Sequence, residues 1–335
     1  MNPTARRLLP VVVIGAALAA FPLFGGKFAM DLVTKIMILS IFALSLELLV
    51  GRVGLVCLGH AGFFGIAAYV AALASPQGGA GSLLALLPLA MLAAGAFALV
   101  TGAMSLRTKG VYFIMVTLAF AQMAYYVFHD TKLGGGSDGI YLYFRPELRV
   151  GDAVLLNLDD QKVFYWFTLA MLVATFGFLA VLLRSRFGHA LAGIRVNEQR
   201  MRASGFPTYP YKLAAFVIAA MLAGLAGFLY ALKDGYVNPE ILSWHQSGAV
   251  LVMIILGGIG SLRGAVIGAF AFALLQESFQ NEAWFGPLAR HWQLSLGLTI
   301  IAFVALLPKG LIGLRERFAR GPRRAGAVIG STRHA

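Results

Sequence analysis

The sequence has few of the residues that a soluble enzyme or a disulfide-stabilised protein would need. Its one cysteine, Cys57, excludes an internal disulfide and a thiolate metal cluster, and leaves the redox compartment undetermined. Charged residues make up only 12% of the 335 residues, whereas 59% are hydrophobic, and the mean hydropathy is +0.81. The apolar side chains exceed what one soluble core can use and fall in blocks about as long as a bilayer is thick. We therefore predict a multi-pass membrane protein.

Patterns for catalysis and nucleotide binding are also missing. The only Gly-Lys step, Gly26-Lys27, is followed by Phe28, so the chain has no Walker A motif to hold ATP. No H-x-x-x-H pattern and no pair of carboxylates falls within an apolar run. The glycine-rich stretch GGIGSLRG, Gly257 to Gly264, lacks the G-x-G-x-x-G spacing of a dinucleotide site. We expect no enzyme activity, cofactor or metal on this chain, and any ATP that it uses should bind partner subunits.

Nine apolar runs predict the architecture. Backbone amides in lipid must be paired within their own segment, and the alternation of barrel strands is absent, so the runs should be helices. The predicted fold class is all-α, a polytopic membrane bundle of about eight full spans plus one glycine-broken re-entrant segment, in a single transmembrane domain over residues 1–335. The first run is either a retained anchor or a cleaved signal peptide. The runs are approximately 8–24, 33–50, 53–74, 83–106, 110–128, 163–183, 213–232, 248–275 and 294–307.

The distribution of positive charge predicts the orientation. A net charge of +13 would suggest nucleic acid for a soluble protein, but in a membrane protein it marks the cytoplasmic side. One side would hold 18 of the 27 Lys and Arg residues and only 2 of the 14 acids. That side would include Arg6, Arg7, Arg52, Arg107, Lys109, segment 184–212 and the tail 308–335. Both termini are therefore predicted to be cytoplasmic, with the bilayer and not nucleic acid as the partner.

Nine full crossings would contradict this prediction, because they would place the tail outside. Run 248–275 is long and is interrupted by Gly257 to Gly264, so two half-length helices around a glycine tip would enter and leave on the same face. The alternative is one kinked helix, with the tail outside against the charge rule. Gly260, Gly264 and Gly268 recur every four residues, a stripe that commonly serves close helix packing.

Strongly polar residues are rare inside the apolar runs. A carboxylate in the membrane costs about 3 kcal/mol, so Glu47 should have a partner or a watery neighbourhood. Pairing with Arg52 and a substrate role are both open for Glu47. His60, in LGHAGFFG, is either a packing residue or a ligand. The candidate residues for a translocation pathway are Glu47, His60, Phe63, Gln122, Gly258, Gly260 and Ser261.

The longest basic stretch, residues 184–212, predicts a short cytoplasmic helix. Glu198 and Arg202 form a favourable i,i+4 pair, and Gly205 and Pro207 end the helix. By composition alone the stretch is either a charged loop or an anchor for lipid headgroups.

Six separated stretches together resemble the LivM-type permease subunits of branched-chain amino acid ABC importers. They follow one another in order over about three quarters of the chain: GLVCLGHAGFFGIAAY, RTKGVYFIMVTLAFAQM, GGGSDGI, FGHALAGIRVNEQRMRASG, YKLAAFVIAAMLAGLAGFLYAL and GGIGSLRGAVIGA. The resemblance implies a binding-protein-dependent importer in the bacterial inner membrane. Its other components would be a LivH-like permease subunit, two ABC ATPase subunits and a periplasmic amino acid-binding protein. It also implies that segment 184–212 is the coupling helix, which meets the ATPase through Gly188, Ala192, Arg195, Asn197, Glu198 and Gly205.

Two positions depart from the family pattern. Glu47 stands where such permeases commonly carry asparagine, and Cys57 stands in place of a common serine. The substrate within the family therefore stays open, with urea, short amides and aromatic compounds as alternatives to amino acids. A secondary carrier or channel and a membrane-embedded enzyme are the competing functions. A proton-coupled carrier should show more buried ionisable groups, and an enzyme should show a catalytic cluster.

Overall fold

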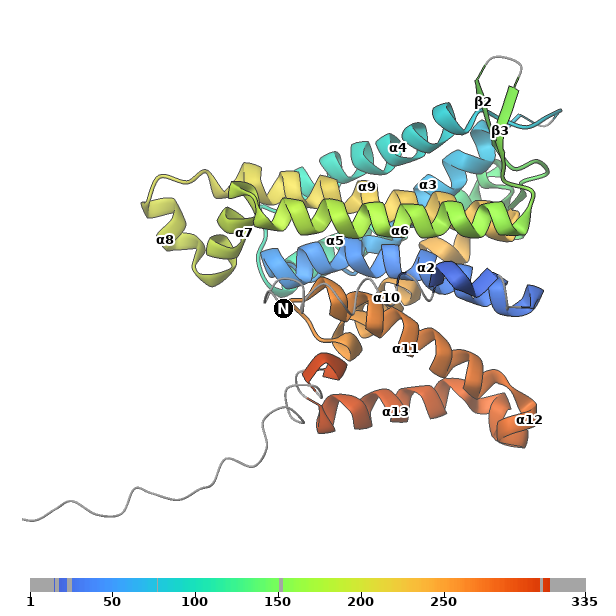
Figure 1. Cartoon of the computed structure of the whole chain (residues 1–335). Helices are drawn as coiled ribbons and strands as arrows, with labels where there is room; N and C mark the ends of the chain where they lie inside the picture. Colours follow the sequence, from blue (N-terminus) through green and yellow to red (C-terminus); the bar gives the residue numbers. More distant parts are fainter. Residues whose placement is uncertain are drawn as a thin grey trace, which may run out of the picture.

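The computed structural model describes residues 15, 18–22, 26–76, 78–150, 153–307 and 310–313, and most of them lie in helices packed along one common direction (Figure 1). Seven stretches of this described part are long and apolar enough to cross a membrane, each containing one of the long helices. The long helices are α2 (Lys27–Glu47), α4 (Leu83–Ser105), α5 (Val111–Asp130), α6 (Gln161–Arg184), α9 (Thr208–Asp234), α11 (Leu262–Gln280) and α13 (Trp292–Leu306). The predicted polytopic helical bundle is confirmed.

The bundle has two different ends (Figure 1). At one end lie the short helices α7 (Arg186–Val196) and α8 (Glu198–Ala203). At the other end lie two small antiparallel sheets and helix α12 (Glu282–Phe285). The strands pair as β1 (Ile140–Tyr141) with β4 (Tyr236–Val237), and β2 (Glu147–Val150) with β3 (Ala153–Asn157). We refer to these as the α7 end and the strand end.

Helix α9 is central to the packing, with α2, α3 (His60–Ala74) and α4 against it. Helices in lipid gain little from the hydrophobic effect when they associate, so close van der Waals packing has to hold them together. The glycines of α9 permit that approach. A Cβ atom at Gly227 would overlap the backbone carbonyl of Phe64 in α3, and one at Gly224 would press on Ala94 in α4. The small residues of this apolar helix therefore have a packing function.

Helix α3 is shorter than its apolar run. After α2 the chain makes a π-helical turn, η1 (Leu48–Val53), and continues without helix until His60. A Cβ at Gly59 would overlap the carbonyl of Thr117, so this non-helical loop is packed tightly against α5. Run 53–74 is thus a loop followed by a 15-residue helix rather than one full-length span.

The glycine-broken run forms a hairpin of α10 (Trp244–Gly257) and α11. The chain reverses at Gly258 and Gly260, whose φ angles of 112° and 97° suit glycine. A Cβ at Gly268 would overlap the carbonyl of Met253, and one at Gly257 would overlap that of Gly264, so the two helices pack antiparallel. This excludes one kinked helix. Helix α11 has 19 residues and is long enough to cross, so only α10, with 14, has the expected half length.

The predictions for the two ends of the chain are not tested by the structure. The first apolar run, 8–24, and the basic tail, 308–335, lie largely outside the described residues. The cytoplasmic position of both termini therefore stays a prediction.

Candidate coupling segment and pathway residues

The basic stretch forms two helices joined at Asn197. Ser185 Oγ accepts a hydrogen bond from the Gly188 amide at the start of α7, at 3.5 Å. Asn197 has an extended backbone, and its Oδ1 accepts from the Arg200 amide at 2.9 Å, which caps α8. Gly205, with a φ of +84°, follows the end of α8. The local sequence therefore sets the bend and both helix ends, and the single helix that we expected is two.

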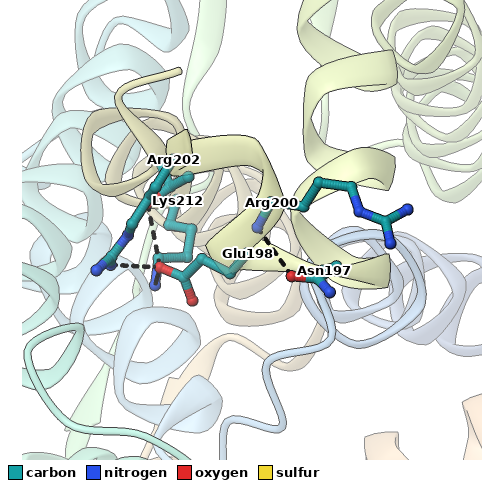
Figure 2. A network of polar contacts seen from close by, with 6 residues as sticks. Asn197, Glu198, Arg200, Arg202 and Lys212 are labelled. Atoms are coloured by element: carbon teal, nitrogen blue, oxygen red, sulfur yellow. Dashed lines mark hydrogen bonds and ion pairs between the residues drawn. The ribbon is translucent and has the colours of Figure 1, made fainter. Parts of the chain in front are cut away.

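Glu198 fastens α8 to the start of α9 (Figure 2). Its Oε1 accepts hydrogen bonds from Arg202 Nη2 at 2.6 Å, Lys212 Nζ at 2.9 Å and Thr208 Oγ1 at 3.1 Å. The Lys212 side chain is only 6% exposed and that of Glu198 is 21% exposed. Burial works against ionisation of Glu198, but the hydrogen bond and charge of Lys212, with Thr208 and Arg202, outweigh it and hold the pKa of Glu198 below its usual value.

This geometry differs from the partner contact inferred for Glu198 from sequence, because its carboxylate faces α9. The exposed surface of α7 and α8 is formed by other residues, among them Ala192, Val196 and Arg200. A cavity of about 400 Å³ lies between the two helices, lined by Ala192, Gly193, Val196, Asn197, Arg200 and Met201. Of the six predicted coupling residues, Ala192, Arg195, Asn197 and Gly205 are exposed, Glu198 is half-buried and Gly188 is buried.

A second set of contacts joins α7 to the hairpin tip. Arg195 Nη1 donates to the carbonyl oxygen of Gly51 in η1. Glu47, buried at the end of α2, accepts a hydrogen bond from the Gly260 amide on its Oε1 at 2.7 Å. Its Oε2 has no hydrogen-bond partner among the described residues, and the charges of Arg52 and Arg195 act on the carboxylate. Pairing with Arg52 was one of the two roles left open for Glu47, and its hydrogen bond goes instead to the Gly260 amide in the glycine tip.

The structure thus brings Glu47 and Gly260 together at the α7 end, with Gly258 and Ser261 in the same tip. Ser261 Oγ accepts from the Gly264 amide at 3.1 Å and caps α11. The glycines let the tip backbone approach Glu47, and the serine starts the returning helix. These four predicted residues form one cluster.

His60 and Phe63 lie apart from that cluster, in an aromatic part of the core. His60 is fully buried, its Nε2 lies 2.8 Å from Ser45 Oγ, and its ring stacks on Phe42 with 5.4 Å between centroids. Phe63 packs edge to face on Phe216, with 5.4 Å between ring centroids. These contacts favour the packing interpretation of His60. Gln122 is half-buried on α5, and its side-chain carbonyl oxygen has no hydrogen-bond partner within the described part.

Comparison with known proteins identifies the family. Residues 28–305 match the family model described as the permease component of the branched-chain amino acid transport system. The chain belongs to this family. The matched region includes every predicted coupling and pathway residue. The permease is also 30% identical over 328 residues to the high-affinity branched-chain amino acid transport system permease protein LivM of Salmonella typhimurium and to that of Escherichia coli K12. Each alignment covers 92% of this chain and 76% of the relative.

Relatives that match a smaller share of the permease are named as components of other transport systems. The xylose transport system permease protein XylH of Escherichia coli K12 is 31% identical over 99 residues, which is 28% of this chain and 25% of the relative. The autoinducer 2 import system permease protein LsrC of Klebsiella pneumoniae is 33% identical over 166 residues, covering 47% of this chain and 44% of the relative. No solved structure matches the permease significantly.

Two residues of the permease that organise the segment were missed from sequence. Lys212 lies beyond the predicted helix stop, and Gly51 contributes only its backbone carbonyl. A lysine at the start of an apolar helix was a signal that could have found Lys212, because a cation there needs a partner. The sequence offers no signal for the Gly51 contact.

Proposed function

We propose that this permease is one membrane subunit of an ATP-driven importer for branched-chain amino acids or related small polar solutes. The observation that carries the proposal is the similarity to LivM over 92% of the chain. The xylose and autoinducer 2 permeases among the relatives favour leaving the solute class broad.

The other components follow from the same proposal. A LivH-like permease would stand beside this chain in a bacterial inner membrane. Two ABC ATPase subunits would bind the α7 end, and a periplasmic amino acid-binding protein would bind the strand end. The α7 end and both termini would then be cytoplasmic, which the concentration of positive charge supports. ATP would bind and be hydrolysed on the ATPase subunits, while this chain catalyses no reaction and binds no cofactor.

The contacts of α7 and α8 suggest how ATPase movement would reach the membrane helices. Glu198 connects the segment to α9 through Lys212, and Arg195 connects it to η1 through Gly51. A shift of the segment on ATP binding would act on both, and Gly51 lies one helical turn from Glu47, which holds the hairpin tip. The passage would change from inward-facing to outward-facing, and hydrolysis would reverse the change.

Reconstitution tests the proposal. The permease is purified with the proteins that copurify from its own host and placed in liposomes, and uptake of labelled leucine, xylose and urea is measured with ATP or a non-hydrolysable analogue. We expect uptake of one solute class only with ATP and an added binding protein. Uptake driven by an ion gradient without ATP would overturn the proposal and indicate a secondary carrier.

A further inference from the structure

The chain returns into the bundle from the strand end without forming a helix. Helix α9 ends at Asp234, β4 follows, and α10 begins only at Trp244 after the short turn η4 (Pro239–Leu242). A Cβ at Gly65 in α3 would overlap the Leu242 side chain, and Ser247 Oγ accepts a hydrogen bond from the Ala61 amide at 2.8 Å. The first turn of α10 therefore lies beside the first turn of α3.

This contact fixes the depth of the α10 start. Helix α3 continues from Ala61 to Ala74 at the strand end, a length of about 20 Å at 1.5 Å per residue. Helix α10 continues from Ser247 to Gly257 at the α7 end, a length of about 15 Å. A hydrocarbon core is about 30 Å thick, so the first turn of α10 lies near its middle.

The side chains in this turn are not those of a lipid-facing surface. Trp244 is 44% exposed, and His245 and Gln246 are also exposed. The first amides of a helix have no partner within it, and non-helical backbone at this depth is stable only where protein or water surrounds it. Glu240, in η4 above this turn, is exposed as well, and a carboxylate facing lipid would be costly.

Helices α4 and α13 show the contrast. Apart from Gln293 in the first turn of α13, their large exposed side chains are aliphatic or methionine: Leu84, Leu89, Leu92, Leu99, Val100 and Met104 on α4, and Leu294, Leu298, Ile301, Val304 and Leu306 on α13. These surfaces suit lipid directly. The surface at the start of α10 does not.

Helix α5 extends the polar surface. It contacts η4 and α10, and it runs parallel to α3, with Gly62 against Ala121 and Tyr69 stacked on Phe128. Gln122, which is half-buried, therefore lies at the depth of the α10 start, and its side-chain carbonyl oxygen is buried without a hydrogen-bond partner within the described residues. Tyr126, one turn further, is 54% exposed. Hydrogen-bonding groups thus occur on both elements.

We propose that the first turn of α10, with His245 and Gln246, and the adjoining part of α5, with Gln122, form one wall of a water-filled passage for the solute. Glu240 lies at its mouth on the strand side. These groups can exchange hydrogen bonds with a zwitterionic or polar neutral solute, and Glu240 can attract an ammonium group. The inference rests on the proposed function and adds the residues that line the path.

Thiol labelling tests this wall. Single cysteines replace His245 or Gln246 in a Cys57→Ser background, and the full chain is expressed from its own locus with its natural partners. We expect a small, water-soluble, membrane-impermeant methanethiosulfonate to label both cysteines in right-side-out vesicles. Leu92→Cys on α4, with its 60% exposed side chain, is the matched lipid-facing control and should stay unlabelled.

Ser137→Cys, exposed at the strand end, is the positive control. The passage is rejected if Ser137→Cys is labelled while neither cysteine of α10 reacts in the presence or absence of ATP, because the surface is then dry. Labelling is measured independently of uptake. If uptake depends on ATP but the α10 cysteines are not labelled, the proposed passage is rejected and the proposed importer function stands. If the cysteines are labelled but uptake needs no ATP, the passage stands and the importer function is rejected.

A second measurement addresses solute contact. Gln246→Leu removes the amide at nearly constant volume and should lower uptake at least tenfold with normal abundance, whereas Leu92→Ala should transport normally. Normal uptake by Gln246→Leu would show that this side chain does not contact the solute.

Discussion

Replacing Glu198 with glutamine tests whether the α8 segment is anchored by a buried ion pair. Sequence alone pairs Glu198 with Arg202, an i,i+4 contact worth about 0.5 kcal/mol at an exposed site. The structure adds Lys212, whose side chain is only 6% exposed. Removing one partner of a fully buried ion pair costs about 3–5 kcal/mol, because the remaining charge is left without compensation.

Two features reduce that cost for Glu198→Gln. The Glu198 side chain is 21% exposed, so water can partly solvate the Lys212 ammonium when the carboxylate charge is removed. Glutamine also keeps an oxygen that can accept a hydrogen bond from Lys212 Nζ. We expect a destabilisation of about 1–3 kcal/mol, and more for Glu198→Lys, which adds a like charge. Arg202→Ala, with an Arg202 side chain that is 53% exposed, should cost no more than about 0.5 kcal/mol.

Thermal unfolding of the solubilised protein, followed by size-exclusion chromatography, measures these differences. Lys212→Met in the Glu198→Gln background provides the decisive comparison, since it removes the uncompensated charge and keeps an apolar stem. We expect this double variant to regain most of the lost stability. Equal midpoints for Glu198→Gln and Arg202→Ala, or no recovery in the double variant, would refute the buried-pair argument.

Three further predictions concern the tip and the anchor. Gly268→Ala should sharply lower the amount of folded protein in the membrane, measured by immunoblot of the membrane fraction, because its Cβ would overlap the Met253 carbonyl. Gly297→Ala, with open space around it, should leave that amount unchanged in the same assay. Glu47→Leu should abolish uptake by releasing the Gly260 amide, and Glu47→Gln, which keeps an acceptor, should retain more uptake than Glu47→Leu. The contribution of Glu198 to stability should be complete above its ordinary pKa of 4.5 and fall as pH drops through the lower pKa of the folded protein, and thermal unfolding of wild type and Glu198→Gln across that range should converge.

Features set by bilayer thickness could be predicted from sequence. The apolar runs predicted the helical bundle, and the glycines from Gly257 to Gly264 predicted where the α10–α11 hairpin reverses. The shortening of α3 could not be predicted, because residues 54–59 are as apolar as the helix that follows. Their non-helical course depends on tight packing of Gly59 against Thr117, a contact between segments that are distant in sequence.

The candidate residues show a similar division. Glu47 was identified from its rarity in an apolar run, but its hydrogen-bond partner is the amide of Gly260, more than two hundred positions away. His245 and Gln246 could not be identified from sequence, because they precede an apolar run and resemble ordinary loop residues. The contacts of Ser247 with Ala61 and of Leu242 with Gly65 place them at membrane depth. Sequence identifies unusual residues in a span, whereas depth depends on tertiary contacts.

The two anchors of the α7–α8 segment differ in chemistry, and the difference bears on how it could move. Glu198 and Lys212 form a charged pair whose breakage would leave a buried ammonium, so α8 and the start of α9 should move together. Arg195 donates to a backbone carbonyl in η1, where the wider π-helical turn already departs from regular helix geometry. Arg195 is exposed, so that one hydrogen bond can pass to another acceptor without leaving a buried charge uncompensated. Movement imposed on α8 would therefore carry α9 as one unit, and the sliding contact would be the one between Arg195 and η1, beside Glu47 and the glycine tip.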